Sequence, residues 1–318
     1  MFFAAATFLV LSGIASLSYQ VIWVRLLGLS MGSTSASIST VLAAFFLGMA
    51  AGSYLAERMT RNRVDNLKTY IVLEVLIGVS GLALLPILLH LDNIMAWLPA
   101  FGSSLGLKFL LAVVLLSVPT ACMGATFPVM ASILIRHQRD VGLRMSQLYS
   151  LNTAGAVLGA GLSGFVFIPA WGLDGAVYAA VAINVLIIIF AYYVNSRFTL
   201  PPVEVMSPAV ESHAIAETPV LPGVRLRAVM VLFVTGFVAI ATQVGWSKYL
   251  AIFTGTTIYG FAAILTVFLL GIAAGAWAIR RQLEKITDTQ WWMAAGLILL
   301  AASLFITRGG LTLVPNVY

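Results

Sequence analysis

The sequence predicts an all-α integral membrane protein, and two observations support this fold class. Hydrophobic residues make up 61% of the 318 residues and charged residues only 9%, whereas a soluble domain carries about 25% charged residues. Apolar runs of 17 or more residues recur along the chain, and each is long enough to cross a hydrocarbon core of about 30 Å as a helix. The runs do not alternate between apolar and polar residues as the strands of a membrane barrel do.

The apolar runs predict nine membrane-spanning helices. No Lys or Arg precedes the apolar residues 2–10, and the pattern of this first run recurs later in the chain. We therefore interpret it as a retained helix and not as a cleaved signal peptide. The predicted spans are residues 3–24, 36–56, 69–89, 107–130, 146–169, 174–194, 226–246, 257–279 and 291–307.

The longest polar stretch divides these spans into two groups. Residues 195–224 contain five prolines and three glutamates, a composition that cannot bury a core and is typical of a flexible linker. We expect a first unit of six helices over residues 1–194 and a cytoplasmic linker over residues 195–224. A second unit of three helices is expected over residues 225–318.

The basic residues predict the orientation in the cell membrane. Of the 17 Lys and Arg residues, 13 fall on one side of the nine predicted spans, and only Arg25, Lys108, Lys248 and Arg308 fall on the other. Because Lys and Arg near helix ends favour the cytoplasm, the N-terminus and the linker are expected there. The net charge of +6 then calls for anionic lipid headgroups as partners and not for nucleic acid.

Residues 235–281 repeat residues 12–58. Aligned without a gap at a constant offset of 223, the two segments are identical at 15 of 47 positions. The matched pairs include Gln20 with Gln243, Trp23 with Trp246, and Arg25 with Lys248. Unrelated apolar segments share Leu, Val and Ala, but not Gln, Trp, Gly and a cation in register, so we interpret the similarity as an internal repeat.

The position of the repeat predicts a parallel arrangement. Six predicted spans separate the start of one copy from the start of the other, so both copies are expected to enter the membrane in the same direction. This is the arrangement of the two halves of major facilitator transporters, and we expect a facilitator-like helical bundle. At the same offset Tyr318 corresponds to Met95, so the second unit is expected to lack equivalents of three helices of the first.

Three glycine pairs predict close helix packing. Gly48 and Gly52 form a GxxxG motif that the second copy repeats, and the fifth predicted span adds a pair at the same spacing. Such motifs let helix backbones approach closely in lipid, and they offer a surface for homo- or hetero-oligomers. The further pairs are Gly271 with Gly275 and Gly155 with Gly159.

Four segments carry a resemblance to a known family. They read "SGIASLSYQVIWVR", "FFLGMAAGSYLAER", "YIVLEVLIG" and "PTACMGATFPVM", and they resemble the membrane part of fused major-facilitator/spermidine-synthase proteins. The resemblance implies a membrane module that serves a cytosolic aminopropyltransferase domain, whose donor is decarboxylated S-adenosylmethionine. No glycine-rich strand-to-helix turn with a following acidic residue occurs after Trp291, so we expect this chain to be catalytically silent and to need no cofactor.

The matched cations Arg25 and Lys248 allow two interpretations. Both lie near predicted helix ends beside Trp23 and Trp246. In the first interpretation the cations reach the lipid headgroups and the tryptophans belong to the aromatic belt. In the second, the cations face a cavity between the two halves and meet an anionic group of a solute.

Glu74 and the matched glutamines also allow two interpretations. Glu74 lies inside the third predicted span, where an unpaired charge is costly, so we expect either a salt bridge to the basic residues 58–63 or a site for a proton or an amine. Gln20 and Gln243 are expected either to hydrogen-bond between helices or to line a cavity. Tyr149, Asn152 and Asn184 are single polar residues of apolar helices and are expected to find partners on neighbouring helices.

Metal and nucleophilic chemistry are not indicated. Cys122 is the only cysteine, and the three histidines are spread over two loops and a helix end, so neither a metal site nor a catalytic set is predicted. The sequence is compatible with three functions. They are a membrane module of an enzyme fusion, a transporter for a small amine or other small solute, and a structural subunit of a membrane complex.

Overall fold

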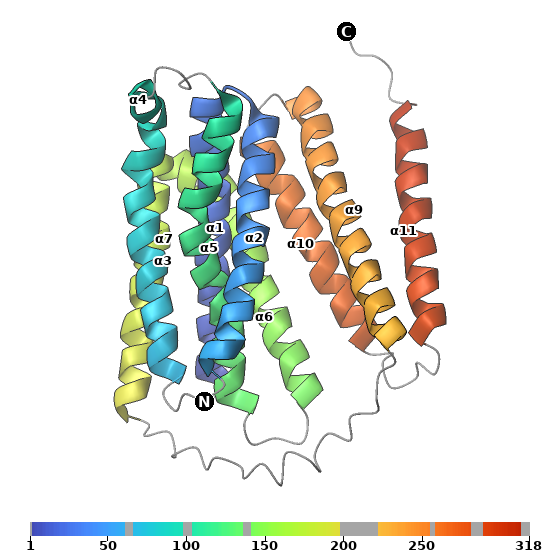
Figure 1. The fold of residues 1–318 in the computed structure, drawn as a ribbon, viewed down its shortest axis with the longest axis horizontal. Coiled ribbons are helices and arrows are strands. Elements are labelled where there is room, and N and C mark those ends of the chain that lie inside the picture. The colour runs from blue at the N-terminus through green and yellow to red at the C-terminus, as the bar shows by residue number, and fades with distance from the viewer. Residues whose placement is uncertain are drawn as a thin grey trace. The chain divides into compact units, whose positions relative to one another are not determined.

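The structure is a computed structural model that describes residues 2–60, 66–97, 104–135, 141–197, 222–254, 258–280 and 289–312. Every regular element in these ranges is a helix (Figure 1). Six helical segments are long and apolar enough to cross a membrane, and two shorter apolar helices span Tyr259–Gly275 and Trp291–Ile306. The prediction of an all-α, multi-pass membrane protein is confirmed, while the side that faces the cytoplasm stays a prediction.

The helices begin and end close to the predicted spans. They are α1 (Phe2–Met31), α2 (Thr34–Thr60), α3 (Asn66–Leu89), α4 (Leu91–Ala96), α5 (Leu105–Ile135), α6 (Val141–Leu162), the π-helical turn η1 (Ser163–Phe167), α7 (Ile168–Arg197), α9 (Pro222–Thr254), α10 (Ile258–Arg280) and α11 (Thr289–Thr312). Each predicted span lies on these helices except residue 257, which lies outside the described residues.

The fifth and sixth predicted spans belong to one helical segment that reverses its direction. Met145–Arg197 contains 53 residues, which would measure about 80 Å as a straight helix at about 1.5 Å per residue. The segment bends at Gly172, whose φ of 71° and ψ of −173° are non-helical. A positive φ costs glycine little, so α6 and α7 can form two separate crossings.

The chain divides into two compact units, Met1–Ala273 and Ala274–Tyr318. The first of these compact units contains α1 to α9 and most of α10, so it is longer than the six-helix unit predicted over residues 1–194. The second contains the end of α10 and α11. From here on, the first unit means residues 1–273. Residues 198–221, the centre of the predicted linker, lie outside the described residues, and the remaining linker residues are helical.

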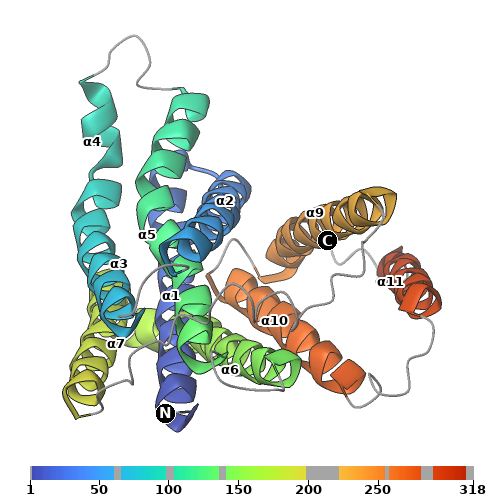
Figure 2. The same ribbon diagram turned by 60° about the horizontal axis from the view of Figure 1, so that its bottom comes forward.

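Helix α1 is the centre of the first unit. It packs against α2 and α6 on one side and against α3 and α7 on the other (Figure 2). Within its most apolar window 72% of the residues are buried. Helix α5 completes this packing through long contacts with α2 and α3.

Close approach between these helices depends on glycine. A Cβ atom at Gly48 or Gly52 would collide with Thr120 or Ala121 of α5, and one at Gly155 or Gly159 would collide with the backbone of α1. The α2–α5 and α1–α6 crossings therefore require these glycines. In contrast, a Cβ atom at Gly271 or Gly275 would meet no atom of the described residues within 4 Å.

A polar cluster joins three helix ends of the first unit. Lys108 Nζ of α5 lies 2.7 Å from Asp92 Oδ1 of α4 and donates a 2.7 Å hydrogen bond to the backbone oxygen of Ser30 in α1. The Ser30 hydroxyl donates to the same Asp92 oxygen over 2.7 Å. The Lys108 ammonium group, as a hydrogen-bond donor, lowers the pKa of Asp92.

Candidate functional site

A cavity of about 200 Å³ lies inside the first unit between α1, α2, α5, α6, α9 and α10. Its polar lining residues are Ser16, Gln20, Thr126, Tyr149, Asn152, Thr153 and Gln243. Its other lining residues are Gly13, Leu17, Leu42, Phe45, Phe46, Met49, Met123, Phe127, Ala156, Leu265, Phe268, Leu269 and Ile272.

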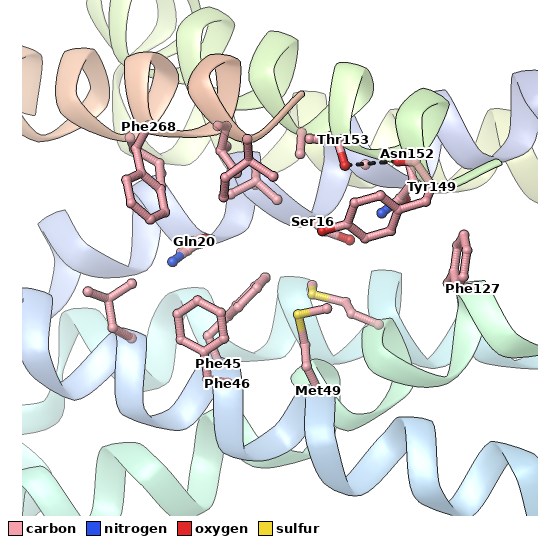
Figure 3. A pocket seen from close by; sticks show the side chains of 18 of the residues that line it. Ser16, Gln20, Phe45, Phe46, Met49, Phe127, Tyr149, Asn152, Thr153 and Phe268 are labelled. Carbon is pink, nitrogen blue, oxygen red and sulfur yellow. Dashed lines mark hydrogen bonds between the residues drawn. The ribbon is translucent and has the colours of Figure 1, made fainter. Parts of the chain in front are cut away.

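Two ends of the cavity differ in character. Figure 3 shows Ser16, Tyr149 and Asn152 gathered towards one end, while Gln20 lies among aromatic rings that include Phe268 at the other. The Thr153 hydroxyl donates a 2.8 Å hydrogen bond to the backbone oxygen of Tyr149. The first end therefore offers hydroxyl and amide groups beside the Tyr149 and Phe127 rings, and the other offers the Gln20 amide beside further aromatic surface.

The lining residues of α2 and α10 correspond one to one. Helix α2 contributes four lining residues, and adding the offset of 223 to their numbers gives the four lining residues of α10. The pairs are Leu42 with Leu265, Phe45 with Phe268, Phe46 with Leu269, and Met49 with Ile272. The same offset relates the two lining glutamines, so positions that align at this offset line the same cavity.

Gln243 brings an unsatisfied polar group to this cavity. Its side chain is only 2% exposed, and its Nε2 atom has no hydrogen-bond partner among the described residues. A buried amide nitrogen without a partner costs about 1–3 kcal/mol. A ligand that accepts a hydrogen bond from Nε2 would recover this cost.

The chemistry of the lining favours a small uncharged ligand. None of the lining residues is Asp, Glu, Lys, Arg or His, and an unpaired ionic group is costly in such surroundings. The volume lies below the roughly 300–1,000 Å³ of sites for drug-sized ligands. No group of three or more His, Cys, Asp and Glu side chains suited to a metal ion occurs within the described part of the chain.

Glu74 occupies a second polar site, away from the cavity lining. It is fully buried in α3, and its Oε2 accepts a 2.7 Å hydrogen bond from Asn184 Nδ2 of α7. The Tyr19 hydroxyl of α1 donates to Asn184 Oδ1 over 2.9 Å. We call these three residues the Glu74 network.

The Glu74 network contains no cation. Of the basic residues 58–63 considered as partners, Arg58 stacks over the Tyr54 ring at 4.6 Å, and Arg61 and Arg63 lie outside the described residues. The hydroxyl groups of Ser12 and Tyr70 lie beside the carboxyl group. Glu74 Oε1 nevertheless has no hydrogen-bond partner of ordinary geometry among the residues that the structure describes.

The matched cations and tryptophans lie apart from the cavity. Arg25 and Lys248 are exposed, and neither lines the cavity. Trp23 is fully buried and stacks on Tyr19 with ring centroids 5.5 Å apart. Trp246 is half-buried and meets the Tyr249 ring edge-on at 6.0 Å.

Several residues of these sites were not singled out from the sequence. Asn184 lies 110 residues from Glu74 and 165 residues from Tyr19 in the sequence, and no local pattern predicts contacts over such distances. The α6 residues Tyr149, Asn152 and Thr153 could have been found from their spacing, because positions three and four apart share a helix face. The α10 lining residues could have been found by applying the repeat offset to α2.

Comparison of the chain with protein-family models, with curated proteins and with solved structures finds no match.

Proposed function

We propose that this chain is a facilitator-like membrane module that binds a small uncharged solute in the cavity and carries it across the membrane. The observation that carries the proposal is the correspondence between the lining residues of α2 and α10 at the repeat offset. In transporters built from repeats, the substrate site lies where the repeats meet. A parallel repeat whose copies face one cavity fits that arrangement.

The polar lining supports a solute with hydrogen-bonding groups. Gln243 Nε2 offers an unused donor, and Gln20 presents a second amide to the same cavity. Phe45 and Phe268 supply apolar surface close to Gln20. A compact molecule with a carbonyl, ether or hydroxyl oxygen and an apolar part suits this lining better than a polyamine, because no carboxylate is present to pair with ammonium groups.

Cysteine accessibility tests the proposal. In a Cys122→Ser background, which removes the only native cysteine, Gln20→Cys and Asn152→Cys would be exposed to a membrane-impermeant thiosulfonate reagent. The matched control is Val79→Cys on α3, whose side chain is 62% exposed on the outer surface of the helix. Thiols that face lipid stay protonated and react slowly, since the thiolate is the nucleophile.

The rate of reaction is compared between the two faces of the membrane and between each cavity variant and the control. In a transporter, Gln20→Cys reacts in both right-side-out and inside-out vesicles, because the cavity opens to each side in turn. Reaction from one side only would contradict passage across the membrane. Reaction no faster than Val79→Cys on either side would overturn the cavity as a solute site and favour a structural subunit.

A second candidate function is the membrane part of a polyamine-synthesising protein. The segments that resemble the fused facilitator/spermidine-synthase proteins also supply cavity residues, among them Gln20, Phe45 and Phe127. In this function the cavity would receive the product or substrate of an enzyme domain. Protection of Gln20→Cys by spermidine, with no protection by a neutral solute of similar size, would favour it over the first candidate.

A further inference from the structure

The buried carboxyl group of Glu74 has surroundings that a purely structural role does not require. Oε2 accepts from Asn184 Nδ2, whose orientation is fixed because the Tyr19 hydroxyl donates to Asn184 Oδ1. Oε1 has no such partner among the described residues. A glutamine at position 74 would satisfy a structural network equally well, since its side-chain oxygen could accept from Asn184.

Among the described residues, no charged group faces Glu74 from the helices packed around it. The neighbouring groups are Ser12 and Tyr19 from α1, Tyr70 from α3 itself, Cys122 from α5 and Asn184 from α7. An isolated carboxylate inside a membrane bundle is costly. Burial therefore favours the protonated form of Glu74 in the Glu74 network.

The same surroundings accept both protonation states. When Glu74 is protonated, Oε1–H can donate to the hydroxyl oxygen of Ser12 or Tyr70. When it is ionised, the same hydroxyl groups can turn and donate to the carboxylate, because a hydroxyl group is both donor and acceptor. Tyr70 would then give up its 3.4 Å hydrogen bond to the Phe8 backbone oxygen. Asn184 Nδ2 donates to Oε2 in either state. Hydroxyl groups beside Glu74 can therefore serve both protonation states once they approach Oε1.

Helix α1 connects this carboxyl group with the cavity. Ser12, Ser16 and Gln20 follow one another at intervals of four residues and so lie along one face of the helix. Ser12 lies beside Glu74, whereas Ser16 and Gln20 line the cavity. The step from Ser16 to Ser12 is about one helical turn, or about 6 Å along the axis.

We propose that Glu74 is a proton-binding site that exchanges its proton with the cavity along the Ser16 and Ser12 face of α1. Hydronium in the cavity water supplies the proton and is left as water, and binding converts the carboxylate to the neutral acid. The inference rests on the proposed function only in that the cavity admits water. It adds proton binding as a second activity of the membrane unit.

Infrared spectroscopy tests this proposal directly. The full chain in lipid nanodiscs would be titrated, and the carbonyl stretch of protonated carboxyl groups would be followed in wild type and in Glu74→Gln. The matched control is Glu57→Gln, which changes an exposed carboxyl group on α2. We expect a protonated-carboxyl band at neutral pH that survives in Glu57→Gln, disappears in Glu74→Gln and is lost on alkaline titration.

Two further variants keep the test decisive if Glu74→Gln does not fold. Asn184→Ala removes the donor to Oε2 and should shift the band to higher frequency, because the carbonyl group loses a hydrogen bond. Ser12→Ala should slow hydrogen–deuterium exchange of the band at least severalfold, without removing the band. Absence of the band in wild type at neutral pH, or its persistence in Glu74→Gln, would overturn the proposal.

The two experiments fail independently. The cysteine reagent reports whether water and solutes reach the cavity, whatever the protonation of Glu74. A protonated-carboxyl band that never exchanges with deuterium, in a chain whose Gln20→Cys reacts freely, would contradict the proton route and leave the solute site intact.

Discussion

The two segments that align at the offset of 223, which we interpret as copies of a repeat, have very different surroundings. In the first copy, α1 is the centre of a helix bundle, with 72% of its most apolar window buried, whereas the most apolar window within Val229–Ala251 of α9 is only 6% buried. The matched tryptophans follow this difference, since Trp23 is fully buried and Trp246 is half-buried. Identical residues therefore become core or surface according to the helices that pack around them.

The cavity is where the two copies agree. Gln20 and Gln243 are each only 2% exposed, and both face the same space. The copies differ again at the Glu74 network, because Tyr19 and Glu74 correspond to Thr242 and Leu297 at the offset of 223. The proposed solute site thus draws on both copies, while the proposed proton site belongs to the first alone.

The largest difference between the copies is expected at the glycine motifs. Gly52→Leu places a side chain against the backbone of Ala121 in α5, which cannot rotate away. Overpacking usually costs about 1–3 kcal/mol, and here we expect a greater loss and little folded protein. The matched variant Gly275→Leu meets no atom of the described residues within 4 Å and should leave the melting temperature in detergent nearly unchanged.

This prediction can also break the comparison. If Gly275→Leu lowers the melting temperature as much as Gly52→Leu, the glycine motif of α10 packs against another helix in the membrane. Size-exclusion chromatography after a temperature series measures both variants side by side.

The tryptophans give the next largest effect. Trp23→Ala leaves a large void in the core beside Tyr19, and such truncations cost about 3–5 kcal/mol. Trp246→Ala should cost less than half as much, because its ring is already half-exposed. Thermal unfolding of the two variants under one condition checks this, and equal losses would mean that α9 is as enclosed as α1.

The Glu74 network sharpens the comparison at a smaller scale. Tyr19→Phe removes the hydroxyl group that donates to Asn184, and a typical buried hydrogen bond contributes about 0.5–1.5 kcal/mol. Thr242→Val changes the equivalent position of α9, where the sequence offers no counterpart of Glu74, and should have a smaller effect. Equal destabilisation in thermal unfolding would show that the second copy holds a polar network of its own.

The sequence predicts the helices well because the bilayer sets their length and polarity. The reversal after the fifth span was expected between residues 169 and 174, and the break lies at Gly172. The short helix α4 was not predicted, because its six residues are too few to form an apolar run of membrane-spanning length. The confirmed part of the fold is therefore its all-helical, membrane-spanning character.

Two sequence signals indicated the sites, namely the repeat for the cavity and a charge inside a predicted span for Glu74. Gln20 and Gln243 attracted attention because they match in register, and a lining role was one of their two interpretations. Glu74 attracted attention because of its charge, but its partner Asn184 is 110 residues away and is chosen by the packing of α3 against α7. The matched charges of Arg25 and Lys248 did not indicate which surface each side chain faces.

The smallest effect is expected at the polar cluster around Asp92, which also distinguishes the copies. Ser30 and Asp92 correspond to Phe253 and Pro315 at the repeat offset, so the sequence of the second copy cannot form this cluster. Lys108 lowers the pKa of Asp92 in the folded protein. The cluster therefore stabilises the fold above the unfolded pKa of about 3.9, and this contribution is lost as the pH falls through the lower, folded pKa.

Since the Asp92 side chain is 58% exposed, solvent screens the pair and its contribution should lie below about 1 kcal/mol. Asp92→Asn should lower the melting temperature by one or two degrees at most at pH 7, and the difference from wild type should vanish in strong acid. High salt should shrink the difference at neutral pH, because screening weakens exposed ion pairs. A difference that persists in acid would mean that Asp92→Asn acts by something other than loss of charge, since the protonated carboxyl group and the asparagine amide can both accept the Ser30 hydrogen bond.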